Sequence, residues 1–234
     1  MRENCTSGIA PGAPGNRRPY GGGHMNSHRS QPSRPYLREP IPEIENAAAI
    51  LADAVNEHLA GRRSNAAVLL ASANMPSIRS WTESLWGKKS AYAPSGPYLP
   101  SPAFVAATPQ RIPSPQLQQE LHRRDGYYCR FCGIPIVRKQ VRERIRKLYP
   151  EVHVWGPKNV DQHAALQCMW AQYDHLVPHS RGGENVLTNL VVTCAPCNYG
   201  RMQYTLQEAG LVNPLERLPR TGPWRGLEEL LSSP

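Results

Sequence analysis

Two pairs of closely spaced cysteines constrain the fold of this chain more than any other feature. Each pair has the C-x-x-C spacing, and the pairs are Cys129 with Cys132 and Cys194 with Cys197. Cysteines at this spacing can direct two thiolates to one ion, and two such pairs complete the four-sulfur shell that structural zinc prefers. The long segment between the pairs must then fold back. The sequence therefore predicts a structural Zn²⁺ site, with Gly133 supplying the positive φ that a tight turn around the metal requires.

The cellular setting and the net charge narrow the class of partner. No run approaches the roughly 20 consecutive apolar residues of a membrane span, and the N-terminus lacks the apolar core of a secretory signal. We therefore expect a cytoplasmic protein without a membrane partner, in which reducing conditions favour metal-bound or free thiols over disulfides. The formal net charge of +9 favours a polyanion, with nucleic acid the first candidate, although charge alone is a weak indicator.

Changes in composition divide the chain into five parts. Residues 1–40 carry scattered glycines, prolines and arginines without apolar periodicity, and we expect a disordered basic tail. In residues 41–87, apolar side chains recur at three- and four-residue spacings, which predicts a small helical region. Residues 88–113 contain six prolines and predict an extended linker. The domain that carries the paired cysteines then spans residues 114–225, and residues 226–234 form a C-terminal tail.

Capping and breaking residues predict the helices more closely. The expected helices run from Glu43 to Gly61, from Asn65 to Ala73, from Pro76 through Trp86, and from Ser114 towards Gly126. We expect Trp81 and Trp86 to pack against neighbouring helices rather than to stack on bases.

A basic segment lies between the cysteine pairs. Residues 137–160 contain an amphipathic helical pattern with Val141, Ile145 and Leu148 on its apolar face. The cations of this segment are Arg138, Lys139, Arg142, Arg144, Arg146 and Lys147. The segment is interpreted either as an arm that contacts phosphates or as a solvated helix face, and the pattern leaves both open.

The region before the second cysteine pair carries a recognisable motif. Residues 173–183 read Tyr-Asp-His-Leu-Val-Pro-His-Ser-Arg-Gly-Gly, and Asn189 precedes an apolar run that ends in C-x-x-C and Asn198. This arrangement resembles the HNH nuclease motif, and the resemblance covers about residues 114–225. It implies an α+β protein with a small ββα-metal domain. His175 and His179 also have the four-residue spacing of zinc proteases, but Pro178 lies between them and no glutamate follows His175, so that class is excluded.

The resemblance and the chemistry of phosphodiester hydrolysis assign the same roles. His175 is the expected general base, because an imidazole that titrates near neutrality can accept a proton from water. Asp174 and Asn198 offer oxygen ligands to a catalytic Mg²⁺ or Mn²⁺ ion. The last position of the family's signature is often histidine. Because Asn198 stands there instead, the motif is a His-Asn-Asn variant, which favours hard cations over softer ones.

Three further residues complete the predicted site. Asn189 is expected to fix the loop between two strands and so to orient the base, and Arg181 and Arg201 are expected to hold substrate phosphates. The sequence thus predicts a metal-dependent HNH endonuclease whose partner is nucleic acid, with DNA favoured. The alternative is a non-catalytic zinc-dependent nucleic-acid-binding module. The acidic Asp174 argues against it, because a carboxylate repels phosphate unless a cation intervenes.

Overall fold

A computed structural model describes four stretches of the chain, which are residues 33–86, 90–94, 110–152 and 154–232. Most of the predicted basic tail and of the predicted linker lies outside the described residues. Beside the helices and strands introduced below, five short 3₁₀ helices are described: η1(Pro150–Val152), η2(Asn159–Asp161), η3(His179–Arg181), η4(Pro214–Glu216) and η5(Glu228–Leu231). No helix among the described residues has the length and apolar character needed to cross a bilayer.

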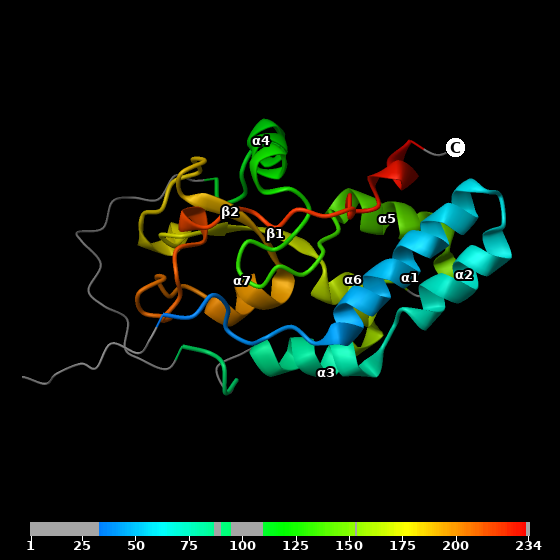
Figure 1. The fold of residues 1–234 in the computed structure, drawn as a ribbon, viewed down its shortest axis with the longest axis horizontal. Helices are drawn as coiled ribbons and strands as arrows, with labels where there is room; N and C mark the ends of the chain where they lie inside the picture. The colour runs from blue at the N-terminus through cyan, green and yellow to red at the C-terminus, as the bar shows by residue number, and fades with distance from the viewer. Residues whose placement is uncertain (1–32, 87–89, 95–109, 153, 233–234) are drawn as a thin grey trace, which may run out of the picture. The chain divides into compact units, whose positions relative to one another are not determined.

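Three consecutive helices form the first part of the fold (Figure 1). They are α1(Pro42–Leu59), α2(Arg63–Ser72) and α3(Pro76–Leu85). The apolar stripe of α1 is buried, and α1 packs along α2. Gly61 follows α1 with a φ of 76°, which a residue with a side chain adopts at a cost. The three helices predicted here are confirmed, although the second begins two residues earlier than expected and the third ends at Leu85.

This helical region packs directly on the part of the chain that carries the cysteines. Helix α3 contacts α6(Ala164–Cys168) and α7(Ala195–Arg201), and the described residues share one hydrophobic core. Trp81 is 1% exposed within that core and donates a hydrogen bond from Nε1 to Glu39 O at 2.8 Å. Trp81 is therefore a packing residue, as predicted. The boundaries drawn between domains from composition stay predictions.

Two helices precede the motif. In α4(Pro115–Asp125), Ser114 Oγ accepts a hydrogen bond from Leu117 N at 3.2 Å, which is the expected N-terminal cap. Helix α5(Lys139–Leu148) buries Val141 and Ile145 and confirms the predicted amphipathic helix.

A two-stranded sheet and the helix after it form the motif itself. Strand β1(Ala171–His175) pairs antiparallel with β2(Leu190–Cys194), in a register that sets His175 opposite Leu190. Every residue of β2 is buried, and α7 begins directly after it and packs against both strands. Such an arrangement of two strands and a helix is the predicted ββα unit of an α+β fold, and the fold class is confirmed.

Both ends of the described chain pack more closely than their composition predicts. Arg34 N donates to Gly210 O at 2.9 Å and Leu37 is 3% exposed, so the end of the predicted basic tail is built into the fold. Residues 226–232, predicted as a tail, contain η5, in which Leu230 is 1% exposed and which contacts α1 and α5. Single apolar anchors of this kind leave no periodic pattern, so only the contacts reveal them.

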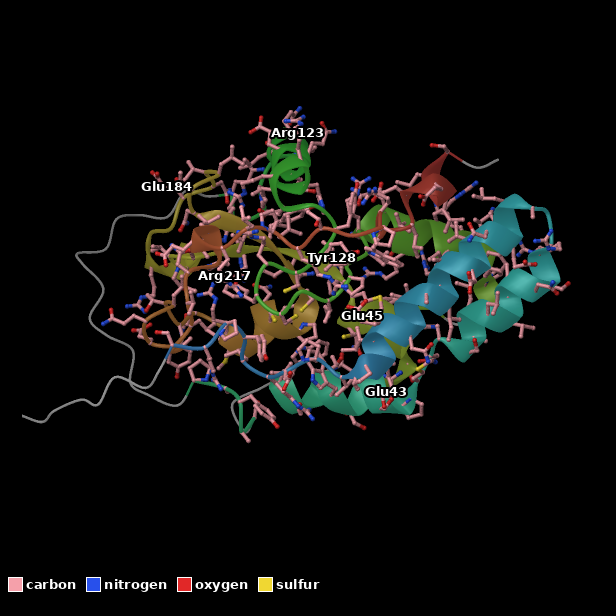
Figure 2. All side chains as sticks on the ribbon, viewed as in Figure 1. Glu43, Glu45, Arg123, Tyr128, Glu184 and Arg217 are labelled. Atoms are coloured by element: carbon pink, nitrogen blue, oxygen red, sulfur yellow. The ribbon has the colours of Figure 1, made fainter. Side chains whose placement is uncertain are left out.

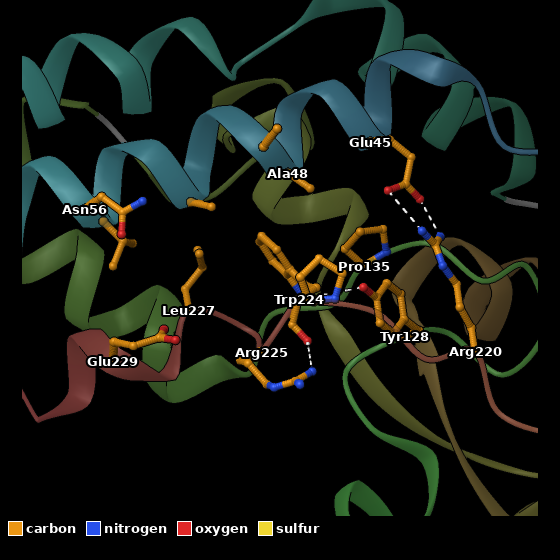
Figure 3. Close-up of a pocket in the computed structure, with 14 residues that line it drawn as sticks. Glu45, Ala48, Asn56, Tyr128, Pro135, Arg220, Trp224, Arg225, Leu227 and Glu229 are labelled. Atoms are coloured by element: carbon orange, nitrogen blue, oxygen red, sulfur yellow. Dashed lines mark hydrogen bonds and ion pairs between the residues drawn. The ribbon is translucent and has the colours of Figure 1, made fainter.

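The segment before η5 is held by two hydrogen bonds and by an ion pair with α1 (Figure 3). Trp224 N donates to Tyr128 Oη at 3.2 Å and its indole Nε1 donates to Ile136 O at 2.8 Å, while Arg220 pairs with Glu45 at 2.5 Å. A hollow of about 320 Å³ remains between this segment and α1, and none of the predicted site residues lines it. Figure 2 shows the labelled charged residues Arg123 and Glu184 at the periphery of the molecule.

Candidate functional site

The four paired cysteines converge. Their Sγ atoms all lie within 4.8 Å of one another, and the Sγ atoms of Cys132 and Cys194 are 3.6 Å apart. A tetrahedral ion with metal–sulfur bonds of about 2.3 Å requires sulfurs roughly 3.8 Å apart. The donor set and its spacing therefore fit a bound metal ion such as zinc.

Local backbone geometry explains how each half of the cluster forms. Cys129 N donates to Ile134 O at 2.9 Å, which closes a tight turn around the first pair. Gly133 has a φ of 76° within that turn, as predicted. The second pair lies where β2 runs into α7, so the cysteine cluster brings the turn and the ββα unit together.

A cleft of about 850 Å³ lies beside the ββα unit. Asp174 and His175 at the end of β1 and Asn198 on α7 all line it. The structure thus brings the predicted base and the two predicted oxygen ligands to one cleft. Asn189 and Arg181 are not among its lining residues.

His175 is held from one side by a residue that the sequence did not single out. Its Nε2 lies 2.8 Å from Asn185 Oδ1, and Asn185 Nδ2 donates to Gln110 O at 2.6 Å. Because the amide nitrogen is engaged with Gln110, the amide oxygen faces the imidazole and accepts from Nε2–H. The proton of the neutral ring is then on Nε2, and Nδ1 is the basic nitrogen.

Burial also determines the charge of this imidazole. His175 is 6% exposed, and burial lowers its pKa below the usual 6.5, while the hydrogen bond to Asn185 and the charge of Asp174 oppose that shift. The ring is therefore neutral at pH 7, as a general base must be. The ring of His179 lies 5.4 Å away, measured between centroids, and its positive form would lower the pKa further.

Asp174 and Arg201 form a buried ion pair. Arg201 is 1% exposed, and its Nε donates to Asp174 Oδ2 at 2.9 Å while Nη2 donates to Asp174 Oδ1 and, at 2.5 Å, to His175 O. Its Nη1 donates to Tyr204 O. The expectation that Arg201 holds a substrate phosphate is therefore not supported, because its donors already serve the protein. Arg201 itself also lines the cleft, and it joins the Asp174 carboxylate to the backbone carbonyl of His175.

Arg181 also has an internal partner. Its Nη1 lies 2.5 Å from Glu208 Oε2, and the two side chains are 12% and 3% exposed. The expectation that Arg181 contacts phosphate is likewise not supported. Neither ion pair could be predicted from local sequence, because each joins residues that are 27 positions apart.

Asn189 closes the turn between the two strands. Its Oδ1 accepts from Val177 N at 2.8 Å, and its Nδ2 donates to Val177 O at 3.2 Å and to Glu184 O at 3.0 Å. The turn is tight enough that a Cβ added to Gly183 would lie 1.8 Å from Val177 O. These contacts hold the turn, and the effect of Asn189 on the orientation of His175 stays a prediction.

Asn198 extends towards the same cleft from the first turn of α7. It is half-buried, and its Nδ2 lies 3.4 Å from Gln172 Oε1 on β1. Its amide oxygen is a ligand type suited to a hard divalent ion, as is the carboxylate of Asp174.

The basic helix α5 is largely engaged within the protein. Arg138 pairs with Glu228, Arg146 with Glu143, and Arg142 is 3% exposed. Of the described α5 cations, Lys139 lines the cleft. Lys139 is thus the α5 cation that lies at the cleft, and a phosphate-contacting role of this segment stays a prediction.

Comparison with known proteins agrees with the geometry. Residues 162–201 match the HNH endonuclease family model, and this range holds β1, the turn, β2 and α7. No curated protein and no solved structure gives a match. The resemblance seen in the sequence is confirmed over these residues: the chain contains an HNH region, which indicates a nuclease or nucleic-acid-binding function, and the four cysteines beside it can bind metal.

Proposed function

We propose that this protein is a metal-dependent endonuclease that hydrolyses phosphodiester bonds in nucleic acid, with DNA the favoured substrate and His175 the general base. One observation carries the proposal. A neutral imidazole, oriented through Nε2 by Asn185, lines the same cleft as the oxygen donors Asp174 and Asn198. A base, a hard-cation donor set and a cleft are the parts that hydrolysis of a phosphodiester requires.

The roles of the chain's own residues follow from their contacts. His175 Nδ1 accepts a proton from a water molecule as its oxygen attacks phosphorus, and the bond from phosphorus to the leaving oxygen breaks. Asn185 keeps the imidazole in the tautomer in which Nδ1 carries no proton. Asn189 holds the turn that begins directly after the base.

A catalytic ion fits the donors beside His175. Asp174 accepts two hydrogen bonds from Arg201, and a carboxylate has about four lone-pair sites, so acceptor capacity remains for a cation. When bound, Mg²⁺ or Mn²⁺ supplies positive charge for the phosphate oxygens, and Asp174 and Asn198 are the residues that would hold it. Zinc at the four cysteines would be structural, since four protein ligands leave no open position.

One observation favours the alternative function, which is a zinc-dependent module that binds nucleic acid without cutting it. The charge of Asp174 is balanced by Arg201, so this carboxylate does not need a bound cation in order to tolerate phosphate nearby. The distinction therefore depends on His175 and must be made by an assay of cleavage.

The test is nicking of supercoiled plasmid by purified zinc-loaded protein with added Mg²⁺ or Mn²⁺. The wild type and His58→Ala, which removes a histidine outside the cleft, should nick the plasmid. His175→Ala should be slower by a factor of about 10² or more, which is the contribution of a general base. Equal nicking by His175→Ala would refute the proposed base. Retention of plasmid without nicking by the wild type would favour the binding module.

A further inference from the structure

An exposed tyrosine lies beside the proposed metal ligand. Tyr199 follows Asn198 on α7, lines the cleft and is 41% exposed. Rings of Trp86 and Trp170 contact it at centroid distances of 5.6 and 6.2 Å, in perpendicular and tilted orientations. Large exposed aromatic side chains are costly in water and recur at binding surfaces. Nothing in the hydrolytic roles assigned above uses this ring.

Another aromatic side chain of the cleft packs against a buried cation. Trp170 lines the cleft, and the guanidinium carbon of Arg142 lies 4.4 Å from its ring centroid and 3.5 Å from that of Trp155. Arg142 Nε and Nη1 are buried and have no hydrogen-bond partner among the described residues. Burial lowers the pKa of Arg142 to about 10, so it remains charged at pH 7. Its interactions are with the aromatic rings, which it holds in place.

Further positive charge surrounds these rings. Arg111 and Lys139 line the same cleft, and both are exposed. Burial raises the pKa of Tyr199, and the charges of Arg111 and Arg142 oppose that rise. Aromatic faces interleaved with cations are typical of sites that hold single-stranded nucleic acid, where bases stack on rings and cations follow the phosphates.

We propose that Tyr199 and Trp170 form a base-stacking platform that holds one or two unpaired bases of the nucleic-acid strand beside the hydrolytic site. The inference rests on the proposed function and specifies its substrate as single-stranded or locally unpaired nucleic acid. The reason is steric: the faces of bases in an intact duplex are covered by their neighbours, so a ring can stack only on a base that has left the stack.

Binding without cleavage tests the platform independently of hydrolysis. The His175→Ala protein, without added Mg²⁺ or Mn²⁺, is titrated against a fluorescent thymine oligonucleotide of about 12 nucleotides and against a duplex of the same length. Adding Tyr199→Ala should weaken single-strand binding roughly 5- to 100-fold, the effect of losing one stacked base. Duplex binding should change less than about twofold. Tyr199→Phe, which keeps the ring, should bind as the parent does.

The salt dependence of binding distinguishes electrostatic contacts from stacking. Lys139→Gln should lower the affinity for both the single strand and the duplex, and it should lower the salt dependence of binding. Tyr199→Ala should leave the salt dependence unchanged. Unchanged single-strand affinity in Tyr199→Ala, an equal loss on both substrates, or no single-strand binding by the parent each overturns the platform. Plasmid nicking by the wild type, together with a single-strand affinity that Tyr199→Ala does not change, would leave the nuclease and remove the platform. A single-strand affinity that depends on Tyr199, without any nicking by the wild type, would leave the platform and remove the nuclease.

Discussion

The buried pair of Asp174 and Arg201 is the feature whose perturbation tests the site most directly. Arg201→Met keeps much of the side-chain volume but removes the cation, which leaves the carboxylate, 5% exposed, without its partner. Removing one partner of a buried pair costs about 3–5 kcal/mol. The carbonyl oxygens of His175 and Tyr204 lose a donor as well, and these losses overlap with the first. We expect Arg201→Met to lose about 3–5 kcal/mol of the free energy of unfolding.

A double-mutant cycle separates the ion pair from packing. Asp174→Asn alone leaves the buried guanidinium without a counter-charge and should also destabilise. The double variant Asp174→Asn with Arg201→Met removes both charges. Its loss in the free energy of unfolding should therefore be smaller than the sum of the losses of the two single variants, with a coupling energy of about 1–3 kcal/mol. Urea unfolding of zinc-loaded protein, followed by circular dichroism, measures all four corners. Arg123→Met, which removes an exposed arginine on α4, serves as the control and should change stability by less than about 0.5 kcal/mol. Additive losses, or a loss below about 1 kcal/mol for Arg201→Met, would refute the reasoning.

Three further predictions concern the base, its turn and the metal cluster. The single-turnover nicking rate should fall as the pH drops through the pKa of His175, with a midpoint below 6.5, and Asn185→Ala should move that midpoint lower because it removes a bond that favours the protonated ring; a midpoint above 6.5 would contradict this. Asn189→Ala should cost about 1–3 kcal/mol in urea unfolding, since it leaves Val177 N and O without their partner, and a loss within error would count against a structural role. Cys197→Ser should lose bound zinc, measured by elemental analysis, and melt without a sharp transition, whereas Cys168→Ala should keep the metal because Cys168 lies outside the cluster; zinc retained by Cys197→Ser would exclude the cluster as its site.

Local patterns accounted for much of the fold because helices depend on nearby residues. The apolar stripe of α1, the Ser114 cap of α4 and the amphipathic pattern of α5 each follow from side chains three or four positions apart. The two C-x-x-C pairs were expected to share one site, and this was the one pattern that predicted a contact between distant segments of the chain. These elements could be predicted because their determinants lie within one turn of chain or within one metal shell.

The charged residues of the site could not be assigned in the same way. Arg181 and Arg201 were expected at phosphates because arginines flank the motif, yet each has a carboxylate partner 27 residues away. No sequence pattern distinguishes Asn185 as a partner of His175, although its amide oxygen lies 2.8 Å from His175 Nε2. A side chain's partner depends on which segments meet in space, and neither residue type nor spacing contains that information.

Local sequence patterns alone indicate an HNH region, from paired cysteines that can share a site, a histidine beside an acidic residue, and an asparagine at the start of a helix. Which side chains meet at the cleft, and which partners they have there, depends on the packing of the whole fold. In the packed fold Arg201 is buried and paired with Asp174, Asn185 contacts His175, and Tyr199 is exposed in a cleft that Arg111 and Lys139 also line. The reason is that motif residues are selected by chemistry and close spacing, whereas burial and charge pairing arise from contacts between distant segments, which form only when the core packs.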